Sequence, residues 1–180
     1  MPPGCKLLHF EPHADIRGSF IKLFHDNDFA SHGIDLTIRE QFLSISNRNV
    51  VRGLHFQLPP YDHNKLVSCV QGKIFDAVID LRVGSPTFFN TYSTTLQGGT
   101  GISLYIPTGF AHGFCALTDN SIVSYSTSTH YSAQHDRGIL WSSADINWPL
   151  TDSVIISERD KLHPSLCNFT SPFFYNPDLD

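Results

Sequence analysis

Short strand-like segments follow one another along most of this chain, and turns containing glycine or proline separate them. Helical periodicity is almost absent. It is confined to one or two turns between Asp26 and Gly33 and to one turn at Ser157–Asp160, which has the spacing of a capping box. This succession predicts an all-β sandwich or jelly roll, formed by a single domain over residues 1–180, with a short irregular, partly helical segment at its C-terminal end.

The apolar segments 65–70 and 74–81 are joined by Gln71-Gly72-Lys73. A connection this short with a central glycine is typical of a tight turn between antiparallel strands. We therefore expect these two segments to pair as a hairpin.

Composition narrows the possible partners. The 180 residues are 41% hydrophobic and 16% charged, which suits a globular domain that builds a core without disulfides or metals. A net charge of -5 and the absence of a Lys/Arg run argue against nucleic acid. The four cysteines lack metal-like spacing, and we see neither a signal peptide nor an apolar stretch approaching about 20 residues. We expect a cytoplasmic protein with no membrane contact.

The segment 49–60 places Arg52, Gly53 and His55 in an apolar, β-branched run that Pro59 and Pro60 end. Side chains alternate along a strand, so Arg52 is expected on the face of Leu54 and Phe56, unless a bulge re-aims it. His55 and Gln57 are then expected on the other face. A His-x-Gln pair directed into a strand-built cavity suggests chemistry, although a lone histidine is more often a satisfied core residue.

A metal site is the first chemistry to weigh. The spacing Gly101-x5-Pro107-x-Gly109-x2-His112 resembles the second motif of the cupin superfamily, whose first motif usually carries His-x-His. Here that place holds His55-Phe56-Gln57, so His55 and His112 would need Asp62 or His63 to complete an open site of three ligands. We expect no metal, and a metal-dependent cupin oxygenase or isomerase remains an alternative.

Several blocks in fixed order resemble one cupin family, the dTDP-4-dehydrorhamnose 3,5-epimerases, also called the RmlC family. The blocks are Asp15-x-Arg17-Gly18-x-Phe20, Val51-Arg52-Gly53-Leu54-His55-Phe56-Gln57, Lys65-Leu66-Val67, Asp80-x-Arg82-x-Gly84-Ser85-Pro86-Thr87-Phe88, Ile106-Pro107-x-Gly109-Phe110-Ala111-His112-Gly113-Phe114 and Ser157-x-x-Asp160. Each block alone is weak, but together they cover nearly the whole chain. The resemblance implies a cupin jelly roll, a homodimer, and a cofactor-free epimerase of a nucleotide-linked 4-keto-6-deoxyhexose, most simply dTDP-linked.

The C4 carbonyl of such a sugar acidifies the protons on C3 and C5. Inversion then needs a base, a group that stabilises the enolate, and an acid on the opposite face of the ring. The resemblance implies that His55 is the base and that Asp160 fixes its tautomer. It also implies that Lys65 lies near the C4 oxygen and that Tyr125 is the acid.

The nucleotide pyrophosphate calls for guanidinium groups. By family position the candidates are Arg17, Arg52 and Arg159, and His112 lies beside the sugar. The other residues that the resemblance assigns to substrate binding are Phe20, Gln41, Gln57, Tyr131 and Asp136.

The chain departs from the family pattern at three places. Lys22 stands at an acidic position, Gln41-Phe42-Leu43 replaces Gln-x-Asn in a segment that looks one residue short, and His130-Tyr131 replaces a tyrosine pair. These departures leave the nucleotide base and the sugar open. They also leave open inversion at C3 only or C5 only. A cupin that binds a sugar nucleotide without chemistry is a separate alternative, and the set His55, Lys65, Tyr125 and Asp160 argues against it.

Overall fold

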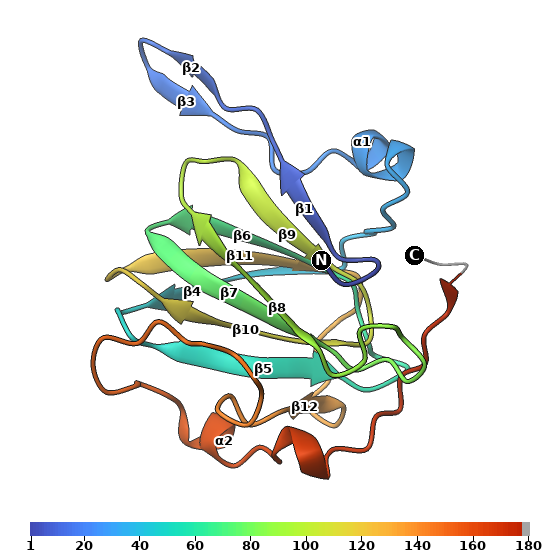
Figure 1. Ribbon diagram of the computed structural model, residues 1–180. Helices are drawn as coiled ribbons and strands as arrows, with labels where there is room; N and C mark the ends of the chain where they lie inside the picture. Colours follow the sequence, from blue (N-terminus) through green and yellow to red (C-terminus); the bar gives the residue numbers. More distant parts are fainter. Residues whose placement is uncertain (178–180) are drawn as a thin grey trace.

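The computed structural model describes residues 1–177 and shows two five-stranded antiparallel sheets packed face to face (Figure 1). Residues 178–180 of the expected domain lie outside the described residues. In order across the first sheet, the strands are β1 (Lys6–His9), β9 (Ile102–Ile106), β6 (Lys65–Gln71), β11 (Ser121–Thr127) and β4 (Glu40–Ser46). Across the second they are β12 (Asp136–Gly138), β5 (Val51–Gln57), β10 (Phe110–Ala116), β7 (Lys73–Asp80) and β8 (Thr91–Gln97).

The remaining elements are short. Strands β2 (His13–Asp15) and β3 (Gly18–Phe20) form a separate hairpin. The helices are α1 (Asp26–Ser31), α2 (Glu158–Lys161) and the 3-10 helix η1 (Leu166–Asn168). None of the helices within residues 1–177 is long and apolar enough to cross a membrane.

The core lies between the two sheets. Val67 and Leu104 of the first sheet pack against Val78 and Phe114 of the second, and all four side chains are fully buried. Burying a side chain of this kind stabilises the fold by about 1.5–3 kcal/mol. The C-terminal segment covers the outer face of the second sheet, where Phe173 joins a second apolar cluster. The prediction of an all-β sandwich with a partly helical C-terminal segment is confirmed.

The prediction that segments 65–70 and 74–81 pair as a hairpin is wrong. Strand β6 pairs with β9 and β11 in the first sheet, whereas β7 pairs with β10 and β8 in the second. Gly72 is therefore a corner where the chain crosses between sheets. It has a positive φ of 77° and packs against Ser121, so a side chain would not fit there.

A β-bulge in β5 corrects the expected direction of Arg52. His112 pairs with His55 and Phe114 pairs with Arg52, so two residues of β5 lie opposite Gly113 alone. Gly53 makes this possible, because a Cβ there would lie 2.7 Å from the Cα of Gly113. The extra residue turns Arg52 towards the cavity that His55 and Gln57 also line, while Leu54 packs in the second apolar cluster.

The β2–β3 hairpin extends away from the two sheets (Figure 1), and the side chains of both strands are exposed. In the turn, the Arg17 guanidinium binds the Asp15 carboxylate of the same hairpin.

A buried carboxylate organises the corner after β7. Asp80 is fully buried and accepts hydrogen bonds from the Arg82 guanidinium, the Ser85 hydroxyl at 2.6 Å and the Thr87 hydroxyl at 2.7 Å. The block Asp80-x-Arg82-x-Gly84-Ser85-Pro86-Thr87 thus serves the fold.

Candidate active site

A cavity of about 710 Å³ opens between the two sheets. Strand β5 of the second sheet supplies His55, and strands β6 and β11 of the first sheet supply Lys65 and Tyr125. Helix α2 closes one side of the cavity with Asp160. Most of the predicted site residues line this one space, namely His55, Lys65, Tyr125, Asp160, Arg52, Gln57, His112, Tyr131, Asp136 and Arg159.

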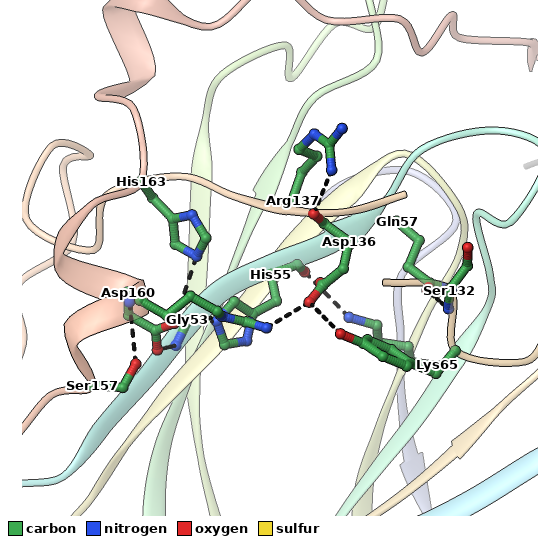
Figure 2. A network of polar contacts seen from close by, with 12 residues as sticks. Gly53, His55, Gln57, Lys65, Ser132, Asp136, Arg137, Ser157, Asp160 and His163 are labelled. Carbon is green, nitrogen blue, oxygen red and sulfur yellow. Dashed lines mark hydrogen bonds and ion pairs between the residues drawn. The ribbon is translucent and has the colours of Figure 1, made fainter. Parts of the chain in front are cut away.

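His55 and Asp160 form a hydrogen-bonded pair (Figure 2), with Nε2 of the ring 2.8 Å from Oδ1 of the carboxylate. The other carboxylate oxygen accepts the backbone N–H of Gly53 at 3.2 Å. Ser157 caps α2, because its hydroxyl accepts the backbone N–H of Asp160 at 3.1 Å. An ionised carboxylate only accepts hydrogen bonds, so the His55 proton lies on Nε2 and leaves a lone pair on Nδ1.

The charges of this pair suit a base. Burial lowers the pKa of His55 below its ordinary value of 6.5, although the hydrogen bond to Asp160 opposes this. Burial alone would raise the pKa of Asp160, but hydrogen bonds from His163, His55 and Gly53 lower it well below its usual range. A neutral imidazole beside an ionised carboxylate is able to take a proton near neutral pH.

Lys65 begins β6, and its ammonium donates a hydrogen bond to the backbone carbonyl of His55 at 3.2 Å. Burial lowers the pKa of Lys65 to about 8, with Asp136 and Asp76 opposing the shift. The side chain thus remains cationic at neutral pH. A cation that lines a cavity can stabilise an oxyanion that is bound there.

Tyr125 stands on the wall formed by the first sheet and is 8% exposed. Its ring stacks on Phe42, with the centroids 4.8 Å apart and the planes 14° apart. Burial raises the pKa of Tyr125 well above its usual range, so the phenol keeps its proton. A protonated phenol across the cavity from an imidazole is suited to act as an acid.

His112 has a carboxylate partner that the sequence did not reveal. Its Nε2 lies 2.9 Å from Oδ2 of Asp76, and both side chains are buried. Strands β10 and β7 pair side by side and bring these residues together. The sequence indicated only that Asp76 needs some polar partner, because it lies in the apolar run from Ile74 to Val78 and would be buried there.

Ion pairs and hydrogen bonds organise the mouth of the cavity. The Arg159 guanidinium lies 2.5 Å from Oδ2 of Asp136, which also accepts the Tyr131 hydroxyl at 3.2 Å. Gln57 is 4% exposed, and its amide group accepts the backbone N–H of Ser132 and donates to the carbonyl of Tyr61 at 2.8 Å. The side chain of Gln57 thus fixes the loops around the mouth.

Three predicted binding residues do not line the cavity. Arg17 and Phe20 lie on the projecting hairpin, and Phe20 borders a smaller hollow of about 370 Å³. Gln41 is exposed and donates to the Ser126 hydroxyl at 3.1 Å. Its neighbours Glu40 and Phe42 face the cavity instead. The binding roles of these three residues stay predictions.

The sequence reasoning gave no site role to Glu40, Phe42 or His163. Glu40 and Phe42 could have been found from the period of two along β4, had the register of that strand been known. His163 carried no local signal, because its place depends on how the C-terminal segment folds back.

The potential metal ligands group differently from the cupin pattern. Among residues 1–177, the ligand atoms of His55, Asp160 and His163 lie within 4.8 Å of one another, and His112 is not in this group. The 2.8 Å separation of His55 and Asp160 is a hydrogen-bond distance, so a proton occupies the space between them. We interpret the group as a hydrogen-bonded network, and a metal-free site stays a prediction.

Comparisons with known proteins agree with this geometry. A protein-family model described as dTDP-4-dehydrorhamnose 3,5-epimerase matches residues 2–168. A Sinorhizobium fredii protein named dTDP-4-dehydrorhamnose 3,5-epimerase is 40% identical over 173 residues, which cover 94% of this chain and 89% of that protein.

Two solved structures share the fold. The Bacillus anthracis dTDP-4-dehydrorhamnose 3,5-epimerase with TDP and PPi bound has a TM-score of 0.88 and 37% identity, covering 91% of this chain and 94% of that one. A Legionella pneumophila epimerase in complex with dTDP-4-keto-L-rhamnose has a TM-score of 0.91 and 30% identity, covering 96% and 94%. The jelly roll is therefore of the cupin type seen in these epimerases, and the chain belongs to the dTDP-4-dehydrorhamnose 3,5-epimerase family.

Proposed function

We propose that His55, Lys65 and Tyr125 carry out the reaction of this isomerase, the inversion of C3 and C5 in a dTDP-linked 4-keto-6-deoxyhexose of deoxysugar biosynthesis. One observation carries the assignment. The free Nδ1 of His55 and the protonated phenol of Tyr125 belong to different sheets, yet both line one cavity. Inversion requires this arrangement, because the proton leaves one face of the carbon and another arrives on the opposite face.

Each inversion has two proton transfers. Nδ1 of His55 takes the proton from C3 or C5, and the electron pair of the broken C–H bond moves to the C4 oxygen as an enolate. The Lys65 ammonium stabilises that negative charge. Tyr125 then gives its proton to the same carbon from the other face and the carbonyl re-forms. Exchange with water restores neutral His55 and the phenol before the next carbon reacts.

The nucleotide pyrophosphate is assigned to two arginines of the cavity. Arg52 and Arg159 both line it, and guanidinium groups match phosphate oxygens geometrically. The ligands named in the Bacillus anthracis and Legionella pneumophila structures support a dTDP-linked substrate.

A homodimer would complete the site. The hairpin that carries Arg17 and Phe20 extends away from the two sheets (Figure 1), and neither residue lines the cavity of its own chain, so both are available to a second copy. Leu43 and Ile45 on the edge strand β4 are each 62% exposed, which gives that copy an apolar surface to cover. We infer that the hairpin of one protomer reaches the cavity of its partner.

The cysteines favour a reducing compartment such as the cytoplasm. Cys5, Cys69, Cys115 and Cys167 form no disulfide among the described residues. Free thiols persist where disulfides are kept reduced.

The test is NMR in D₂O with dTDP-4-keto-6-deoxyglucose as substrate. We expect deuterium at both C3 and C5 and a doubly inverted product, at a rate that chelation does not change. Label at only one carbon would show a mono-epimerase, and activity that is lost with a chelated metal would show a metal-dependent cupin. Nucleotide-sugar binding without label would overturn the catalytic assignment.

A further inference from the structure

A second imidazole stands beside the His55–Asp160 pair. His163 lies three residues after Asp160, and its Nε2 is 3.5 Å from Oδ1 of that carboxylate (Figure 2). Its ring also meets the His55 ring edge-on, with centroids 5.7 Å apart and an interplanar angle of 77°. His163 thus approaches the same carboxylate oxygen that His55 uses, but it does not line the cavity.

The fold holds this ring in place. The backbone N–H of Leu140 donates to the carbonyl of Pro164 at 2.8 Å, which fixes the chain just after His163. Gly138 of β12 leaves the room for the ring, because a Cβ at that position would lie 2.4 Å from its Nε2. The side chain of His163 is only 14% exposed. The sequence therefore provides a specific place for an imidazole behind the base.

The ring nitrogen of His163 that faces Asp160 bonds no other group among the described residues. Nε2 of His163 is buried, and apart from its 3.5 Å approach to Oδ1 of Asp160 it has no hydrogen-bond partner among residues 1–177. A buried N–H beside an ionised carboxylate is stabilised by that charge, so we assign a proton to Nε2 of His163. Oδ1 of Asp160 then faces three donors, namely His55 at 2.8 Å, Arg159 at 3.4 Å and His163 at 3.5 Å.

We propose that His163 is a positioning residue, which shares the Asp160 carboxylate with His55 and thereby limits how strongly Asp160 increases the basicity of His55. The negative charge of Asp160 stabilises the imidazolium that His55 becomes when it takes a substrate proton. A second donor on Oδ1 withdraws part of that stabilisation. His55 consequently stays neutral, and ready to act as a base, down to a lower pH.

Other charged groups act on His55 as well, and they must stay constant in a test. Arg159 and Asp160 come from α2 and Lys65 from β6, and Arg159 is paired with Asp136 of β12. Replacement of His163 removes none of these groups. Any change in the basicity of His55 would then be due to the missing imidazole.

The test is the pH profile of kcat/KM for epimerisation by the full chain, with the titration of the His55 ring followed by NMR. In His163→Leu the acid limb and the His55 titration should both move to higher pH by about half a unit to one unit, the range expected for one hydrogen bond to the carboxylate. In His163→Gln an amide N–H can reach the same oxygen, so the limb should return to within about 0.2 units of the wild type.

Two controls separate this role from a structural one. The pH at which the acid limb of the kcat/KM profile falls does not depend on the fraction of folded enzyme. Partial misfolding of His163→Leu therefore cannot move this limb. His32→Leu replaces an exposed histidine of the α1 end and should leave the limb in place. In an Asp160→Asn background, His163→Leu should cause no further shift. An unshifted limb in His163→Leu, or an equal shift in His163→Gln, would overturn the proposal.

Discussion

The Nε2 atom of His55 and the Oδ1 atom of Asp160 lie 2.8 Å apart, although 105 residues separate them in the chain. Strand β5 fixes the first residue, and the N-terminal cap of α2 fixes the second. The pair therefore depends on the C-terminal segment folding back over the second sheet. This relationship sets the charge and the tautomer of the base, and the first prediction concerns it.

Asp160→Asn should slow the exchange of substrate protons, by less than the loss of about 10²-fold to 10⁴-fold expected for His55→Ala. The histidine keeps its place but loses the charge that supports its protonated form. Binding of dTDP should stay close to that of the wild type, since the pair acts mainly in the transition state. NMR in D₂O measures the exchange rate, and calorimetry measures the binding of dTDP. An exchange rate in Asp160→Asn equal to that of the wild type would contradict the role of Asp160 as the partner of the base.

Tyr125→Phe should separate proton exchange from inversion. His55 can still remove a proton and return deuterium from its own side, but no acid stands on the opposite wall. We expect deuterium at C3 or C5 with far less epimerised product per label than in the wild type. Tyr131→Phe is the matched control, because that phenol lies at the mouth and is 59% exposed. If Tyr131→Phe alone changes the product ratio, then Tyr131 is the acid.

Lys65 should set an alkaline limit on activity. Burial lowers its pKa to about 8, so the cation is present below that pH and is lost as the pH rises through it. We expect kcat/KM to fall above about pH 8 as enolate stabilisation disappears, and to fall on the acid side below pH 6.5, where His55 becomes protonated. Lys65→Arg keeps the charge and should move the alkaline limb upwards, whereas Lys65→Met should lower kcat about 10²-fold to 10³-fold. An alkaline limb that stays in place in Lys65→Arg would assign it to another group.

Subunit mixing tests the shared site. Consider a heterodimer of one His55→Ala protomer and one Arg17→Ala protomer, in which each hairpin reaches the cavity of the other protomer. One of the two sites then carries both substitutions. The other site has an intact His55 and an intact Arg17. Mixing two poorly active variants should therefore restore sites with wild-type KM. If each hairpin serves its own cavity, no intact site can form and mixing restores nothing.

Asp80→Asn should destabilise the fold, by about 3–5 kcal/mol, because it removes the buried negative charge that the Arg82 guanidinium contacts at 3.0 Å. Burial alone would raise the pKa of Asp80, but hydrogen bonds from Arg82, Ser85 and Thr87 lower it. A carboxyl whose folded-state pKa is depressed stabilises the protein above its unfolded pKa near 4, and this contribution is lost as the pH falls.

Urea unfolding from pH 7 down to pH 3 measures both effects of the Asp80 change. The difference in the free energy of unfolding between the wild type and Asp80→Asn should become smaller as the pH falls. Asp28→Asn, at an exposed carboxylate of α1, should change stability by no more than about 0.5 kcal/mol. A constant gap over this range would assign the stability difference to packing.

Local sequence patterns were enough for most elements and for part of the site. The short apolar segments 65–70 and 74–81 predict strands from their own residues, and Ser157 predicts the cap of α2 because its hydroxyl bonds the backbone three residues later. The blocks around His55, Lys65 and Asp160, together with the family resemblance that points to Tyr125, led to residues that line one cavity. These features involve neighbours in the chain, so the sequence itself determines them.

Only the tertiary structure decided which segments meet. The glycine at Gly72 is equally compatible with a hairpin and with a corner between sheets, and the choice depends on β9 and β11 lying beside β6. The face of the strand from which Arg52 or Gln41 projects also depended on how that strand pairs with its neighbours. One extra residue in a strand turns the following side chains to the opposite face. Asp76 and His163 became visible as partners of His112 and Asp160 only after the chain had folded, since a buried charge is satisfied by whatever residue packing brings near, at any distance in sequence.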